Sequence, residues 1–370
     1  MKEAKPHSDP AGGASRWQRA LRGRPWGRGV GSSSGPIIYR WDLDKTYLKS
    51  DFESLRGMAR MPFERAQDKI DEPGVVALIR ALKPAAHGDG RRAFVYFISA
   101  SPPQIGRAIR EKLALDGVEV DGIVFKDQLR HLVRGRFRYL REHVGFKLAE
   151  LLKARLTVPP GSIEYLFGDD WESDPLIYSL YADVVAGRLG VEALGEVLAR
   201  LRIDPARLVE INALAARLTP HDPVRRIFIN LERRTPPGRF RAFGERLVPT
   251  FNYFQTAVVL HLDGLLPAAA VVAVGRSLID RVGYTREQLR NSLDDLVRRG
   301  YVASVSPTLR ADLELGGILP PDGASPSWSG RLWRRLRHGE RSRRGHRGVT
   351  AAGMSGRIDY SRLVESWLAR

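Results

Sequence analysis

The sequence predicts an α/β protein: a doubly wound parallel sheet followed by a mainly helical C-terminal domain. Short apolar runs alternate with segments of helical periodicity from residue 36 to about residue 189, which is the pattern of strands and helices around a parallel sheet. From about residue 190 the periodicity is helical, without a clear strand. Ligands of such sheets bind beyond the carboxyl ends of the strands, so polar residues at these ends are candidates for a functional site.

The predicted elements of the sheet region are short and follow one another closely. The run Ile37–Trp41 begins with two β-branched residues and leads into an acidic cluster, as expected of a buried strand that ends at a site. The other predicted strands span residues 93–98, 118–125 and 163–167. Apolar residues recur at helical spacing in the segments between them, which predicts helices at 74–82, 103–115 and 145–156.

The chain is expected to divide into four parts. These are a disordered basic tail (1–35), the α/β domain (36–189), a helical domain of unknown role (190–319) and a largely disordered, Arg-rich tail (320–370). Helices of the third part are predicted at 191–201, 206–218 and 239–254 and through the apolar stretch to residue 274. A further helix is expected to start at a capping box, Thr285 with Gln288, and to stop at Gly300.

Composition narrows the function further. The formal net charge of +18 favours an anionic partner, nucleic acid or an anionic membrane surface, although much of this charge lies in the two tails. The chain has no cysteine, which excludes disulfides, thiolate metal sites and a cysteine nucleophile.

The apolar stretch 257–275 is interrupted by His261, Asp263 and Pro267, so we expect buried helices there. No signal-peptide pattern precedes Gly35, and a cytoplasmic protein is expected.

The strongest chemical motif is the pair Asp42 and Asp44, which leaves the end of the first predicted strand. An ionised Asp42 can attack a phosphorus atom, while Asp44 can protonate the departing oxygen and later deprotonate the attacking water. Adjacent carboxylates without a histidine cluster suit a hard cation such as Mg²⁺. An acidic turn after a strand would carry the same residues, so the motif requires support from elsewhere in the chain.

That support comes from three later positions. Ser99 ends the second predicted strand and can donate a hydrogen bond to a phosphoryl oxygen, although a serine there also suits a helix cap. Lys147 can offset the charge of a nucleophile and a phosphate, although most lysines are exposed to solvent. Asp169 and Asp174 lie in an acidic loop after the fourth predicted strand and can complete the oxygen shell of a metal.

This order of motifs resembles the haloacid dehalogenase (HAD) superfamily over about residues 36–189. More narrowly, three stretches resemble the catalytic domain of the actin-patch-type, magnesium-dependent phosphatidate phosphatases. They are DLDKTYLKSD from Asp42, YFISASPPQ from Tyr96 and FGDDWESDPLIY from Phe167. The segment 60–82 also resembles the link between the first two motifs of that family.

The resemblance implies a HAD-like fold and a role for each motif residue. It implies Asp42 as nucleophile, Asp44 as general acid and base, Ser99 on the phosphate and Lys147 as the basic clamp. For Mg²⁺ it implies the ligands Asp42, Asp44, Asp169 and Asp174. Two residues depart from the family pattern. Lys45 replaces an acidic residue, and Asp170 replaces a small one, which leaves open which carboxylates contact the metal.

We therefore expect a Mg²⁺-dependent phosphomonoester hydrolase that works through an aspartyl-phosphate, with phosphatidate as the substrate that the resemblance implies. One alternative is a catalytically inactive, HAD-like binding or regulatory protein. Another is a phosphatase that acts on nucleic acid, although the basic segments give nucleic-acid binding little specific support. Arg130–Arg141 and Trp333 among its arginines would suit peripheral contact with an anionic membrane.

Overall fold

The computed structural model describes residues 35–43, 46–47, 71–83, 91–99, 103–126, 136–171, 173–321 and 358–368. Within them, six parallel strands form a single sheet in the order β3-β2-β1-β4-β5-β6. The strands are β1 (Ile37–Asp42), β2 (Ala93–Ser99), β3 (Gly122–Phe125), β4 (Ile163–Asp169), β5 (Val224–Asn230) and β6 (Leu247–Thr250). The α/β architecture with a parallel sheet, predicted from the sequence, is confirmed.

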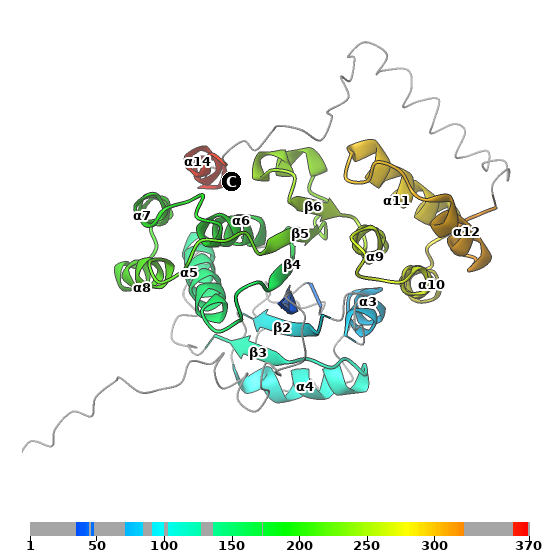
Figure 1. Ribbon diagram of the computed structural model, residues 1–370, viewed down its shortest axis with the longest axis horizontal. Helices are drawn as coiled ribbons and strands as arrows, with labels where there is room; N and C mark the ends of the chain where they lie inside the picture. Colours follow the sequence, from blue (N-terminus) through cyan, green and yellow to red (C-terminus); the bar gives the residue numbers. More distant parts are fainter. Residues whose placement is uncertain are drawn as a thin grey trace, which may run out of the picture.

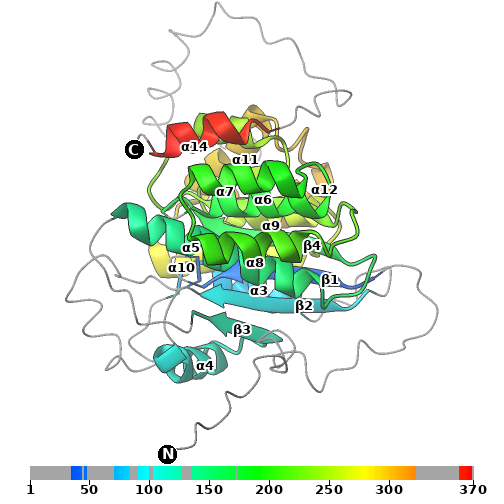
Figure 2. The same cartoon turned by 90° about the vertical axis from the view of Figure 1, so that its left-hand side faces the viewer.

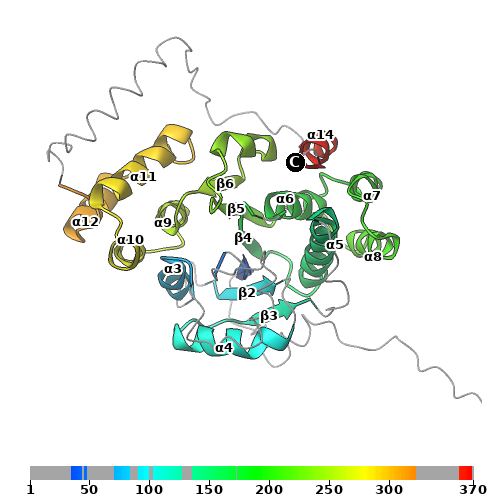
Figure 3. The same ribbon diagram turned by 180° about the vertical axis from the view of Figure 1, so that it is seen from behind.

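Helices cover both faces of the sheet (Figure 1). One face packs against α5 (Arg136–Arg155), α6 (Asp174–Val185), α7 (Val191–Arg200), α8 (Pro205–Ala215) and α14 (Tyr360–Leu368). The other packs against α3 (Val75–Leu82), α4 (Gly106–Leu115), α9 (Tyr253–Leu262), α10 (Ala268–Val282), α11 (Arg286–Arg299) and α12 (Pro307–Leu315). The 3₁₀ helices η3 (Pro103–Ile105) and η5 (Pro237–Phe243) join these elements. Figure 3, seen from behind, shows the same two layers of helices on either side of the sheet.

Side chains along the central strands point alternately to the two faces of the sheet, and each face contributes to its own hydrophobic core. Ile38 faces the core on the α5 side, whereas Tyr39 and Trp41 face the core on the α9 side. Three aromatic rings stack across neighbouring strands in the second core. The ring centroid of Trp41 lies 3.8 Å from that of Phe167, which lies 5.2 Å from that of Phe228. These rings lie one or two residues before the strand ends and fix β1, β4 and β5 relative to one another.

The segment after residue 190 differs from its prediction, because β5 and β6 add two strands to the same sheet. The expectation of helices without strands there was wrong, and the predicted helix 239–254 is instead η5, β6 and the start of α9. Two arginines interrupt the apolar run of β5. The guanidinium group of Arg226 donates two hydrogen bonds to the carboxylate of Asp263. β6 is four residues long and contains Pro249, which an edge strand tolerates.

Two elements of the predicted sheet region also have different bounds. β3 begins at Gly122, not at residue 118, because Asp121 bonds to the backbone N–H of Val95 through its side chain. Helix α5 begins at Arg136, nine residues before the predicted start at Gly145. Gly145 breaks the sequence pattern, but it lies inside the helix where α8 packs closely. A Cβ atom there would lie 3.0 Å from Cγ of Arg207.

The helical predictions after residue 250 are confirmed in most respects. The apolar stretch 257–275 forms parts of α9 and α10, and within the described residues no helix is long and apolar enough to cross a membrane. Thr285 and Gln288 form the predicted capping box of α11, which ends at Gly300 in the left-handed conformation. The parts of the two predicted tails that span residues 1–34 and 322–357 lie outside the described residues.

The end of the chain is a packed helix, although it was predicted as part of a disordered tail. Figure 2 shows α14 beside α7. Tyr360, Leu363 and Val364 are buried in the core on the α5 side, and the Tyr360 hydroxyl donates a 2.7 Å hydrogen bond to Asp183 on α6. The short apolar stripe of this helix is stabilised by tertiary burial rather than by local sequence.

We expect Val364→Asp to destabilise the protein by about 3–5 kcal/mol, because it buries a carboxylate without a partner. Urea denaturation measures the change in the free energy of unfolding. Arg362→Asp is the matched control, since it places the same carboxylate on the exposed side of α14. Equal stability of the two variants would contradict the packing of α14 against α7 and α6.

Candidate active site

The parallel sheet brings three predicted site residues to one edge. Asp42 ends β1, Ser99 ends β2 on one side of it, and Asp169 ends β4 on the other. All three side chains are fully buried. β1 and β4 flank the point at which the strand order reverses, where ligands of doubly wound sheets bind. The predicted convergence of these strand ends is therefore confirmed.

Asp174 reaches the same place from the first turn of α6, where a carboxylate is favoured by the helix dipole. Its Oδ2 accepts a 3.3 Å hydrogen bond from the backbone N–H of Asp169. Gly168 leaves room for this approach. A Cβ atom at Gly168 would lie 2.4 Å from Oδ2 of Asp174, so a larger residue would displace the carboxylate.

Lys147 extends from α5 into the centre of this group, and its side chain is fully buried. Its Nζ lies 2.9 Å from Oδ1 of Asp42 and 2.7 Å from Oδ1 of Asp174. A buried ammonium group is costly unless it is paired, and here it contacts carboxylates from two separate elements. Lys147 therefore lies beside Asp42, the nucleophile candidate.

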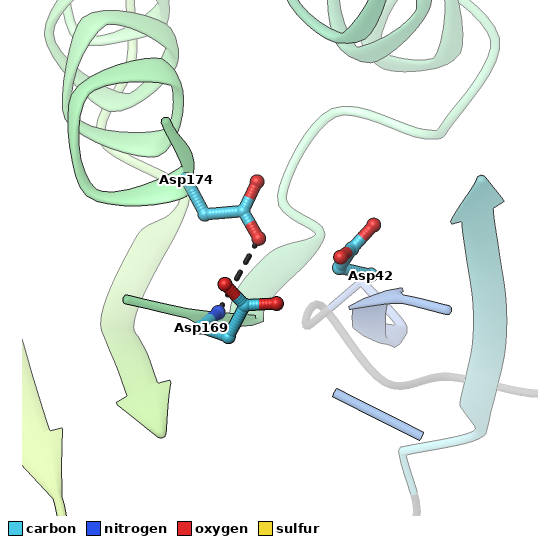
Figure 4. Close-up of side chains that lie close together, drawn as sticks. All are labelled: Asp42, Asp169 and Asp174. Atoms are coloured by element: carbon cyan, nitrogen blue, oxygen red, sulfur yellow. Dashed lines mark hydrogen bonds between the residues drawn. The ribbon is translucent and has the colours of Figure 1, made fainter. Parts of the chain in front are cut away.

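Asp42, Asp169 and Asp174 form a carboxylate cluster (Figure 4). Each offers one oxygen atom, and these atoms lie within 4.8 Å of one another. The backbone N–H of Trp171 donates a 2.6 Å hydrogen bond to Oδ1 of Asp169 and orients that carboxylate. Close carboxylates repel one another, so the cluster favours a bound cation, and an all-oxygen donor set suits a hard ion such as Mg²⁺.

Asp170, which departs from the family pattern, serves a different purpose. Its two carboxylate oxygens accept hydrogen bonds of 2.8 Å from the backbone N–H of Arg233 and 3.0 Å from that of Thr235. Its own N–H donates to the carbonyl of Asn230 at 3.2 Å. Asp170 thus joins the end of β4 to the loop after β5, and it is not part of the carboxylate cluster.

Several residues singled out in the sequence lie outside the described residues. They include Asp44 and Lys45 of the first motif, and residues 130–135 and Trp333 of the basic segments. The remainder of the segment Arg130–Arg141 belongs to the first turns of α5. The predicted roles of Asp44 as general acid and metal ligand therefore stay predictions.

A buried ionic network lies behind the site and was not anticipated. Glu164 of β4 accepts hydrogen bonds from Arg40 of β1 at 2.8 and 3.3 Å, from Arg155 of α5 at 2.9 Å and from Tyr181 of α6 at 2.7 Å. We call these four residues the Glu164 network. A charged residue within each of two otherwise apolar strands is the signal that sequence reasoning could have used.

The Glu164 network connects the same four elements that carry the cluster and Lys147. Arg40 precedes Asp42 by two residues on β1, which places both side chains on the same face. Arg155 follows Lys147 by eight residues on α5, and Tyr181 follows Asp174 by seven on α6. Both spacings correspond to about two helical turns, so each pair lies on one side of its helix. The network therefore holds the elements together two turns below the site.

Ionisation of Glu164 is essential to this network. Burial alone would raise the pKa of Glu164, but the charge and hydrogen bonds of Arg40, the charge of Arg155 and the Tyr181 hydroxyl outweigh it. The pKa falls from its ordinary value of 4.5 to about 2. Because the folded state lowers this pKa, the stabilisation is present above pH 4.5 and is lost as the pH falls toward 2.

We expect Glu164→Gln to reduce the free energy of unfolding at pH 7 by about 3–5 kcal/mol, since it leaves buried arginines without their counter-charge. The difference from the wild-type protein should narrow as the pH falls from 4.5 toward 2. Urea denaturation at pH 7 and pH 3 measures both effects, with the exposed Glu245→Gln as control. A loss no larger than that of the control at pH 7 would show that the network does not stabilise the fold.

Comparison of the chain with protein-family models, with curated proteins and with solved structures finds no match in any of the three. The site itself comprises a buried carboxylate cluster, a buried lysine that contacts two of its members, and a serine at the neighbouring strand end.

Proposed function

We propose that the protein is a Mg²⁺-dependent phosphomonoester hydrolase of the HAD type, with Asp42 as nucleophile. The observation that carries the proposal is the position of Lys147, whose Nζ contacts both Asp42 and Asp174 at the edge of the parallel sheet. A structural ion pair needs one carboxylate for one ammonium group. A cluster of three carboxylates, two of which contact the same lysine, is better explained by a site that receives a cation and a phosphate.

Each residue has a distinct task in this proposal. Lys147 favours the ionised form of Asp42 and restrains its carboxylate. Asp169 and Asp174, together with Asp42, would hold Mg²⁺, which would offset the negative charge of the phosphoryl group. Ser99 ends the strand next to β1 and would donate a hydrogen bond to a phosphoryl oxygen. Asp44 is proposed as the general acid and base from the sequence motif.

The reaction proceeds in two displacements in this proposal. An oxygen of Asp42 attacks phosphorus and forms the aspartyl-phosphate, while the bond from phosphorus to the alcohol oxygen breaks and Asp44 donates a proton to the alcohol. Water then attacks phosphorus and gives its proton to Asp44. The bond to Asp42 breaks, inorganic phosphate leaves, and both carboxyl groups return to their initial state. The sequence resemblance adds phosphatidate to the substrates that need testing.

We expect Asp42→Asn to lower Mg²⁺-dependent hydrolysis of phenyl phosphate on the order of a thousandfold, because an amide cannot form the aspartyl-phosphate. Circular dichroism and urea denaturation would establish that the variant folds. The matched control is Asp280→Asn, since Asp280 is exposed on α10. Unchanged hydrolysis by folded Asp42→Asn would refute the nucleophile assignment, and an inactive wild-type protein would favour the binding or regulatory alternative.

A further inference from the structure

A cavity of about 410 Å³ lies beyond the carboxyl ends of β5 and β6. One wall consists of the chain that follows β5, including Asn230, Glu232 and Arg234. Leu278 and Val282 of α10 add apolar surface to the lining, and Glu72 adds a further carboxylate. The volume of the cavity is in the range that is typical of binding sites for small molecules.

The cavity is connected to the candidate active site through backbone contacts. Asn230 lines it and is the register partner of Asp169 on the neighbouring strand, about 4.8 Å away in a sheet. Tyr253 also lines it, and its hydroxyl donates a hydrogen bond to the carbonyl of Thr46, four residues after Asp42. The cavity therefore lies at the same edge of the sheet as the carboxylate cluster, one strand away from Asp169.

Asp170 fixes the loop that forms the polar wall. Its carboxylate binds the backbone N–H groups of Arg233 and Thr235, on either side of Arg234. Arg234 has φ of 54°, a left-handed conformation that is unfavourable for an arginine. Residues held in this way concentrate at functional sites, where surrounding contacts maintain the strain. The contacts of Asp170 maintain it here.

The polar wall offers three different hydrogen-bonding groups. Asn230, Glu232 and Arg234 occupy alternate positions along the chain and carry an amide, a carboxylate and a guanidinium group. Within the part of the chain that the structure describes, none of these side chains has a hydrogen bond or an ion pair. Asn230 is the most buried of the three, with 8% of its surface exposed, whereas Arg234 is exposed.

We propose that this cavity binds the leaving group of the substrate and that the leaving group is a hydroxyl-rich alcohol, a polyol or a sugar. Hydroxyl groups both donate and accept, so they match a wall with a carboxylate acceptor, a guanidinium donor and an amide that does both. Leu278 and Val282 would contact the C–H surface of the same molecule. The inference rests on the proposed phosphatase function and adds the substrate class.

The first test is a substrate panel for the wild-type protein with Mg²⁺. It compares glycerol phosphate and sugar phosphates with phenyl phosphate and with phosphatidate in mixed micelles. The expected result is a higher kcat/KM for the polyol and sugar esters. Preference for phenyl phosphate or phosphatidate would overturn the proposed class while leaving the phosphatase function intact. Hydrolysis of none of them would overturn the phosphatase function and this inference with it.

The second test uses Arg234→Gly, which removes the guanidinium group and suits the left-handed backbone, and the isosteric Glu232→Gln. We expect each to raise KM for the polyol and sugar esters about tenfold with little change in kcat, and to change the KM of phenyl phosphate much less, because phenol has no hydroxyl groups besides the ester oxygen. Arg225→Gln removes a positive charge at the exposed, opposite end of β5 and serves as control. Equal effects on both kinds of ester, or none, would overturn the assignment of the cavity.

Discussion

The contact of one buried ammonium group with two carboxylates organises this molecule. Lys147 comes from the middle of α5, Asp42 from the end of β1 and Asp174 from the start of α6. The Nζ atom of Lys147 lies 2.9 Å from Oδ1 of Asp42 and 2.7 Å from Oδ1 of Asp174. None of these groups could be buried alone without a large desolvation cost. The fold must therefore hold a helix, a strand end and a helix start in fixed relation, and much of the surrounding core does this.

Two kinds of packing maintain that relation on opposite faces of the sheet. On the α9 side, stacked Trp41, Phe167 and Phe228 lock three neighbouring strands just before their ends. On the α5 side, the Glu164 network ties β1 and β4 to the helices that carry Lys147 and Asp174. The three stacked rings contain no titratable group, whereas the ionic network depends on an ionised Glu164. The carboxylate cluster lies at the carboxyl ends of the strands, beyond both the stacked rings and the Glu164 network.

The parts of this arrangement that follow from local pattern were predictable from the sequence. Apolar runs of β1, β2 and β4 that end in Asp42, Ser99 and Asp169 indicate parallel strands with a shared edge, and the structure has them. β5 and β6 were not predicted, because Arg225 and Arg226 break the apolar pattern of β5 and Pro249 breaks that of β6. Tertiary contacts, such as that of Arg226 with Asp263, stabilise these strands. The role of Asp170 was also beyond prediction, since its partners lie more than 60 residues away.

We propose that Asp42, Asp169 and Asp174 form a site for a divalent cation. Isothermal titration calorimetry of Mg²⁺ into the full chain tests this site without relying on activity. We expect binding to the wild-type protein that weakens about tenfold or more in Asp169→Asn and is unchanged in the exposed Asp280→Asn. A folded wild-type protein that binds no Mg²⁺, or an Asp169→Asn variant that binds it equally well, would show that the cluster is not a cation site.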